Sequence, residues 1–383
     1  MTDNNLPFDI HSLSRELRLL LVCLRTSSEE NYTAELEPWL QNIAWKHFLD
    51  LAQHHRVYPL VHMKLNKLKE GSVPADVLQE LADKYLNNTL KMLRLSMEMD
   101  HLFKLFDEYQ IQALMLKGPV LAKDLYGDLS LRTSKDLDIL VQQKDVLRTE
   151  ELLLQLGYLR EGEALHHFSY FHSTSTINIE IHWRLHPEIG QEPAFQDLWE
   201  RRRISSLSSY PISFLGKEDL FLFLVSHGAR HGWFRLRWLG DIDLLVRKRL
   251  NWDYLIPQLT ELGFHHMAGQ ALILTHQLLH TPIPSEMQSL TKGYEARKLV
   301  QMAFFYIREM RHTDPVMPLH ELVYGKYYSF SLIPNRKQKW SFIIRSFYPQ
   351  SADKETLPLP ESLHALYFPL RPWLWLWRRV NRA

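Results

Sequence analysis

The chain contains, at positions 136–141, the segment Asp-Leu-Asp-Ile-Leu-Val, in which two carboxylates lie two residues apart in an apolar run. On an extended strand, residues two apart point to the same side, so Asp136 and Asp138 share one face. Polar turns at 132–134 and 142–144 bound a strand of ordinary length. A second segment, 177–183, alternates apolar and polar residues with the period of a strand and carries Glu180.

If these two strands are neighbours, three carboxylates converge on one patch, namely Asp136, Asp138 and Glu180. Hard divalent cations such as Mg²⁺ prefer oxygen ligands and usually accompany nucleotide phosphates. We therefore predict that these three residues are the catalytic and metal-binding groups.

Polar residues near the carboxylates are candidates for binding phosphate. Lys117 and Gly118 form a turn about twenty residues upstream, where a backbone approach to phosphate needs a small residue. Arg132 and Ser134 add a cation and a hydroxyl, and His182, two residues after Glu180, faces the same side. We predict these five residues as nucleotide-binding, in a site suited to in-line attack at phosphorus. A structural, hydrogen-bonded His182 is equally compatible with the sequence.

A similar hexamer occurs at 241–246, Asp-Ile-Asp-Leu-Leu-Val, but its context differs. It ends a stretch with helical periodicity, and on a helix positions two apart diverge by about 200°. Asp241 and Asp243 are therefore not expected to share an ion, and Asp241 is expected to pair with a nearby cation such as Arg235 or Arg237. His227 and His231 are expected to face the cleft from the same helical region.

The periodicity predicts an α+β fold in which a small mixed-sheet domain is flanked by helical regions. Residues 1–105 read as a helical N-terminal region without a chemical motif, 106–190 as the α/β core and 191–383 as a mainly helical C-terminal region. Within the core we expect strands at 111–116, 136–141, 166–173 and 177–183, and helices at 119–126 and about 144–156.

The bulk composition restricts the class of protein. The 383 residues include 45 Lys and Arg against 44 Asp and Glu, so no global charge favours nucleic acid, and none is expected as a partner. One cysteine excludes an internal disulfide, and the polar, acidic start lacks a signal-peptide pattern. A cytoplasmic location is expected. The aromatic, basic tail, 367–382, is expected to contact either the protein itself, a partner or a membrane surface.

Several motifs together resemble the uncharacterised nucleotidyltransferase family of bacterial proteins, within the polymerase-β-type nucleotidyltransferase superfamily. The likeness covers about residues 10–265. The matching residues in the core are Leu116-Lys117-Gly118, Tyr126, Arg132, Asp136-x-Asp138-Ile139-Leu140-Val141, Gly157-Tyr158 and Glu180-x-His182-Trp183. Outside the core they are 14–21, His231, Arg237-Trp238-Leu239 and Asp241.

The resemblance implies a nucleotidyltransferase-like domain that uses Mg²⁺ and a nucleoside triphosphate such as ATP, with a small molecule or peptide as acceptor. Asp136 and Asp138 would bind Mg²⁺ and the phosphates, and Glu180 would complete the metal site or accept a proton. Superfamily members carry Gly-Ser at the phosphate-binding turn, whereas this chain has Lys117-Gly118-Pro119. That departure leaves open a phosphotransferase acting on a peptide or small metabolite, and a catalytically inactive nucleotide-binding scaffold.

Overall fold

The computed structural model describes residues 8–26, 29–186, 192–309 and 318–380. The chain divides into two compact units, residues 1–318 and 319–383, and each is described on its own. The predicted α+β class is confirmed, since a mixed sheet lies among helices in the first unit.

The sheet has seven strands in the order β3-β4-β5-β2-β1-β7-β6. The strands are β1 (Ala113–Met115), β2 (Asp136–Val141), β3 (Leu159–Glu163), β4 (His167–His172), β5 (Ile177–His182), β6 (Arg203–Ser205) and β7 (Ile212–Phe214). β2 is parallel to β5 and antiparallel to β1. β4 pairs antiparallel with both β5 and β3, while β7 is parallel to β1.

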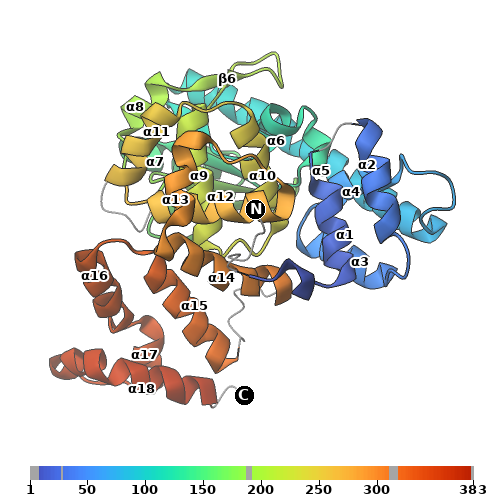
Figure 1. Ribbon diagram of the computed structural model, residues 1–383. Coiled ribbons are helices and arrows are strands. Elements are labelled where there is room, and N and C mark those ends of the chain that lie inside the picture. Colours follow the sequence, from blue (N-terminus) through green and yellow to red (C-terminus); the bar gives the residue numbers. More distant parts are fainter. Residues whose placement is uncertain (1–7, 27–28, 187–191, 310–317, 381–383) are drawn as a thin grey trace. The chain divides into compact units, whose positions relative to one another are not determined.

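The sheet lies among the helices of the first unit, and the first four of these helices form a group at one side of it (Figure 1). The N-terminal ones are α1 (Arg15–Leu24), α2 (Glu29–Leu36), α3 (Trp45–His54), α4 (Tyr58–Leu65) and α5 (Ala75–Glu108). Within and after the sheet come α6 (Pro119–Tyr126), α7 (Val146–Gln155), α8 (Phe195–Glu200), α9 (Lys217–Arg230), α10 (Leu236–Arg247), α11 (Trp252–Glu261), α12 (His265–Leu279), α13 (Gln288–Lys292) and α14 (Tyr294–Glu309).

The two faces of the sheet serve different purposes because side chains alternate along each strand. Leu137 and Ile139 of β2 and Ile179 of β5 are fully buried and share one apolar core with α5, which contributes Leu95 and Met99 among others. Each such aliphatic side chain stabilises the fold by roughly 1.5–3 kcal/mol. The alternate positions place the carboxylates of β2 and β5 on the opposite face.

Several predicted elements match the structure closely. The bounds of β2 and α6 agree with the predicted strand at 136–141 and helix at 119–126. The predicted strand at 111–116 is shorter, at 113–115, although Leu116 N still donates to Asp138 O at 2.9 Å. α10 confirms that Asp241 and Asp243 lie on a helix.

Three strands were not predicted. β3 is polar and mostly exposed, with a register shift between Arg160 and Gly162, so it lacks the alternation that marks a strand. β6 and β7 have three residues each, too few for a periodic pattern. Strand content therefore extends past residue 190, the end of the expected α/β core.

The second unit consists of α15 (Leu319–Leu332), α16 (Arg336–Ser346), α17 (Ser351–Thr356) and α18 (Tyr367–Val380). Arg378 of α18 pairs with buried Asp353 at 2.6 Å, which fixes α18 to α17. Trp373 and Trp377 are 71% and 58% exposed. Arg382 of the expected tail lies outside the described residues.

None of the helices in the described part of the chain combines the length and hydropathy that crossing a bilayer requires.

Candidate active site

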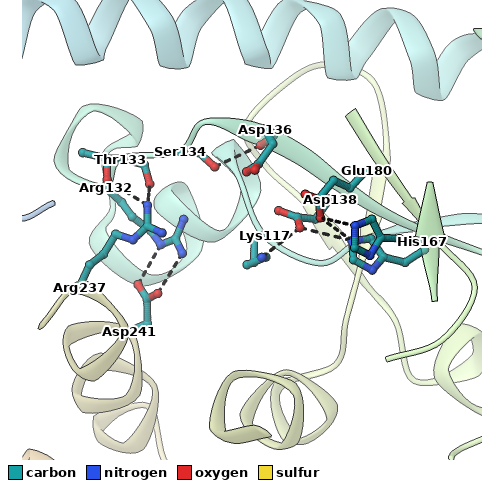
Figure 2. Close-up of polar contacts among 11 residues, drawn as sticks. Lys117, Arg132, Thr133, Ser134, Asp136, Asp138, His167, Glu180, Arg237 and Asp241 are labelled. Carbon is teal, nitrogen blue, oxygen red and sulfur yellow. Dashed lines mark hydrogen bonds and ion pairs between the residues drawn. The ribbon is translucent and has the colours of Figure 1, made fainter. Parts of the chain in front are cut away.

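The register between β2 and β5 places two of the predicted carboxylates side by side. Asp138 pairs with Glu180 across the parallel strands, and Asp136 pairs with Asn178. Partners in register point to the same face of a sheet, so Asp136, Asp138 and Glu180 lie on one surface, as Figure 2 shows. The period-2 patterns of the two segments produce this arrangement directly.

The turn after β1 brings a cation to these carboxylates. Lys117 Nζ lies 3.0 Å from Asp138 Oδ1, and both side chains are largely buried (Figure 2). Gly118 follows with a φ of 85°, a left-handed conformation that glycine adopts readily, and it precedes Pro119 at the first turn of α6. The N-terminus of α6, which is the positive end of the helix dipole, therefore begins two residues after Lys117, and its first residues, 119–122, are buried.

His182 connects the two carboxylates. Its Nε2 lies 3.2 Å from Glu180 Oε2 and 3.4 Å from Asp138 Oδ1, while Nε2 of His167 lies 3.9 Å from Glu180 Oε2. Burial of the His182 imidazole disfavours its charged form, but the contacts with Asp138 and Glu180 outweigh burial and raise its pKa. His182 therefore carries a proton more readily than a free imidazole does.

The two aspartates of β2 differ in their electrostatics. Burial disfavours ionisation of Asp138, but the Lys117 ammonium and the His182 contact outweigh it and hold its pKa well below its usual range. Burial and the neighbouring charge of Asp138 raise the pKa of Asp136. The carboxylates repel each other, and a divalent cation beside them would relieve that repulsion.

The residues present fit a metal ion. Ligand atoms of Asp138, Glu180 and His182 all lie within 4.8 Å of one another, and so do those of His166, His167 and His182. Asp138 Oδ2 is inaccessible to water and has no hydrogen-bond partner within the described residues, although such a buried atom normally costs about 1–3 kcal/mol. A bound cation would satisfy it. The set contains two oxygen donors and an imidazole, and it does not include Asp136.

A cavity of about 400 Å³ opens over this face, within the size range of small-ligand sites. Asp136, Glu180, His182 and Lys117 line one side. Phe223 and His227 of α9, together with His231, Phe234 and Trp238, line the other side. The prediction that His227 and His231 face the cleft is thereby confirmed.

The far wall of the cavity combines aromatic rings with the guanidinium groups of Arg230, Arg235 and Arg237. The Trp238 ring centroid lies 5.3 Å from those of His227 and His231, and 4.9 Å from that of Phe234. Burial lowers the pKa of His227 well below its usual value and that of His231 to about 3, so both imidazoles are neutral at pH 7. The rings offer flat, uncharged surfaces on which a nucleobase can stack.

Arg132 has a partner away from the carboxylates. Its Nε and Nη2 donate to Asp241 at 2.8 and 2.9 Å (Figure 2). Tyr126 donates to the same carboxylate at 2.9 Å. The expected pairing of Asp241 with Arg235 or Arg237 is wrong, since its partner is Arg132, 109 residues earlier.

Two further polar side chains, Arg237 and Ser134, form hydrogen bonds with the segment that precedes β2 and with its first residue. Arg237 Nη1 donates to the carbonyl and to the hydroxyl of Thr133. Ser134 Oγ donates to the backbone carbonyl of Asp136 at 3.1 Å and thereby supports the start of β2. Ser134 and Arg132 do not line the cavity over the carboxylates, although Arg237 does.

The structure adds residues that the motifs did not indicate. Arg56, Lys135, Arg230 and Arg235 bring positive charge to the cavity, and His166 and His167 also line it. Arg56 comes from the turn between α3 and α4, far from the sheet in sequence, so only a three-dimensional arrangement reveals it. The β4–β5 hairpin brings His167 to the cavity, because His167 pairs with His182 across the two strands.

Comparison with protein families agrees with this geometry. A family model described as an uncharacterised nucleotidyltransferase matches residues 41–280, more than half of the chain. The chain belongs to this family. The matched region includes the whole seven-stranded sheet, helices α9 and α10 and the cavity between them. A comparison with curated proteins gives no match.

Membership of the family supports nucleotidyl transfer as the general type of activity. Divalent metal ions are typical of nucleotidyltransferases, and the acidic and histidine groups beside β2 and β5 offer ligands for one. A nucleoside triphosphate is the substrate that such a reaction requires.

Proposed function

We propose that this protein transfers a nucleoside monophosphate from a nucleoside triphosphate to a hydroxyl group of a small molecule or peptide. The observation that carries the proposal is the pairing of Asp138 with Glu180 across β2 and β5, beside Lys117 and the start of α6. Carboxylates and a cation within one cavity, next to the N-terminus of a helix, are groups that bind a metal–triphosphate complex.

We assign roles to the residues as follows. Asp138, Glu180 and His182 would hold Mg²⁺ or a related divalent ion, with Asp136 as a further carboxylate on the same face. The ion would neutralise phosphate charge and lower the barrier to attack at the α-phosphorus. Lys117 would turn from Asp138 to the phosphates, and the start of α6 at Gly118 would face them.

The reaction itself needs a proton acceptor. The acceptor hydroxyl oxygen forms a bond to the α-phosphorus, the bond to the pyrophosphate oxygen breaks, and pyrophosphate leaves with the electron pair. Glu180 is the more accessible carboxylate, at 28% side-chain exposure against 1% for Asp138, which suits it to receive the hydroxyl proton. The aromatic wall formed by Phe234 and Trp238 would hold the base.

The proposal is tested by calorimetric titration of ATP, GTP, CTP and UTP, each with Mg²⁺, into the full-length protein. We expect metal-dependent binding of at least one triphosphate, at least tenfold weaker in Asp138→Asn because the variant removes a ligand charge beside the phosphates. Asp253→Asn, an exposed position on α11, is the matched control and should bind as the wild type does.

Triphosphate binding of equal strength in Asp138→Asn and wild type would contradict the site assignment. Product mass then separates nucleotidyl from phosphoryl transfer, because the acceptor gains either a nucleoside monophosphate or a single phosphate. We expect the reaction in the cytoplasm, where nucleoside triphosphates are made, and no nucleic acid as acceptor, since the net charge is +1.

A further inference from the structure

A second cavity lies beside the candidate active site and has a different chemical character. It measures about 660 Å³ and lies among α3, α4, α5 and the turn that precedes β2. Arg56, Lys135 and Arg235 line both cavities, so the two are adjacent. Lys84 and Lys91 of α5 line the second cavity and not the first. Among the described residues that line the second cavity, Asp50 is the one acidic residue.

The cations of this second cavity are crowded. Burial lowers the pKa of the Lys91 ammonium, Asp136 opposes the shift, and Lys135 and Arg56 add to it. Burial lowers the pKa of the Arg56 guanidinium, and the Asp136 carboxylate partly offsets this shift. Lys91, Lys135 and Arg56 are therefore close enough to destabilise one another, and a bound anion would relieve that repulsion.

Arg56 is held in a conformation that its residue type disfavours. Its φ is 56°, in the left-handed region that glycine adopts more easily. The hydroxyl of Thr133 donates to the Arg56 carbonyl at 3.3 Å and ties this turn to the segment before β2. The left-handed residue closes the C-terminal end of α3, where the Val57 N–H donates to the Ala52 carbonyl at 3.0 Å, so the position of Arg56 beside the cavity is fixed by the backbone.

Arg235 offers a further group to a ligand. Its Nε is inaccessible to water and has no hydrogen-bond partner within the described residues. An unsatisfied guanidinium donor at the border of two cavities is well placed for an anionic oxygen atom, because charge-assisted hydrogen bonds of this kind are strong.

We propose that the second cavity binds an anionic group, a phosphate or a carboxylate, of the acceptor whose hydroxyl receives the nucleotidyl group. This inference rests on the function proposed above and adds the chemical class of the acceptor. Lys91, Lys135 and Arg56 would bind the anion, and the adjacent cavity would receive the hydroxyl beside Glu180.

The test uses inorganic phosphate and, separately, citrate as probes, titrated calorimetrically into the full-length protein without metal. At least one probe should bind the wild type, and Lys91→Gln should weaken its binding about tenfold because one charged contact is lost. Lys69→Gln removes the same charge at an exposed position outside the cavity and should leave the affinity unchanged. Binding of phosphate alone or citrate alone identifies which anion the acceptor carries.

A second variant distinguishes loss of the anion site from misfolding of the protein. Arg56→Gly relieves the left-handed strain and retains the backbone bond from Thr133, so it should fold normally and still bind the probe at least tenfold more weakly. Wild-type affinity in both Lys91→Gln and Arg56→Gly would overturn the proposal.

Addition of saturating ATP with Mn²⁺ separates this proposal from the proposed function. The probe should still bind, since Lys84 and Lys91 line the second cavity and not the cavity that receives the triphosphate. Displacement of the probe by ATP would overturn the second site. Binding of ATP with no binding of either probe would overturn the anion site alone. Binding of the probe with no binding of any triphosphate would overturn the proposed function, and with it the acceptor role of the cavity.

Discussion

Removal of one partner of the buried pair Arg132 and Asp241 should strongly destabilise the first unit. Arg132 is 1% exposed and Asp241 is fully buried, and two hydrogen bonds of 2.8 and 2.9 Å join them. Replacing Asp241 with Leu leaves the Arg132 guanidinium charged and without its partner, which costs about 3–5 kcal/mol in comparable pairs. Tyr126 also loses its acceptor.

The size of the expected effect follows from the size of the unit. At about 2.1 cal/mol/K per residue, residues 1–318 have an unfolding entropy of roughly 0.67 kcal/mol/K, so a loss of ~4 kcal/mol lowers Tm by about 6 °C. Differential scanning calorimetry of Asp241→Leu measures this shift. Asp253→Asn, at an exposed position, is the control and should move Tm by less than about 1 °C.

A double variant tests the cause of that loss. Arg132→Met combined with Asp241→Leu removes both charges, and an apolar replacement of a buried pair is often close to neutral. We expect the double variant to be more stable than Asp241→Leu alone. A Tm for Asp241→Leu within about 1 °C of wild type, or strictly additive losses in the double variant, would refute a structural role for the pair.

Three further outcomes follow from the same structure. Because an imidazole is among the candidate ligands, Mn²⁺ should bind about tenfold more tightly than Mg²⁺, and His182→Asn should remove most of that preference in an equilibrium metal titration. Equal affinities for the two ions in the wild type would exclude His182 as a ligand. Burial raises the pKa of Cys23 to about 12, so the native protein should react with iodoacetamide roughly a hundredfold more slowly than the urea-unfolded chain. Rapid labelling of the native thiol would show that the α1 core opens readily. Burial lowers the pKa of His186 to about 3, so the unfolded chain binds a proton first as the pH falls below about 6.5, and stability is lost between that pH and about 3. His186→Gln should reduce the slope of unfolding free energy against pH by about 1.4 kcal/mol per pH unit in urea titrations, and an unchanged slope would contradict a neutral buried His186.

The core of the candidate site could be predicted from sequence because strand periodicity is local. Alternation in two short segments was enough to place Asp138 and Glu180 on one face, and the parallel pairing of β2 with β5 completes the pair. The helical context of Asp241 could likewise be predicted, and α10 confirms it.

Other features depend on contacts between distant parts of the chain, which a local pattern does not encode. Arg132 lies close to Asp136 in the sequence, yet its partner Asp241 is 109 residues away on α10. The second cavity combines Arg56, from the turn between α3 and α4, and Lys91 of α5 with Lys135 beside β2, although the N-terminal region has no chemical motif. β3, β6 and β7 are too polar or too short for period-2 patterns to identify them.

The central claim is that a divalent ion binds between β2 and β5 together with a triphosphate. Anomalous diffraction at the manganese edge, from crystals soaked with Mn²⁺ and a non-hydrolysable ATP analogue, tests it most directly. We predict an anomalous peak within ligand distance of Asp138 and Glu180, with the phosphates near Lys117 and the start of α6. A peak at another site, or triphosphate density away from these carboxylates, would contradict the account.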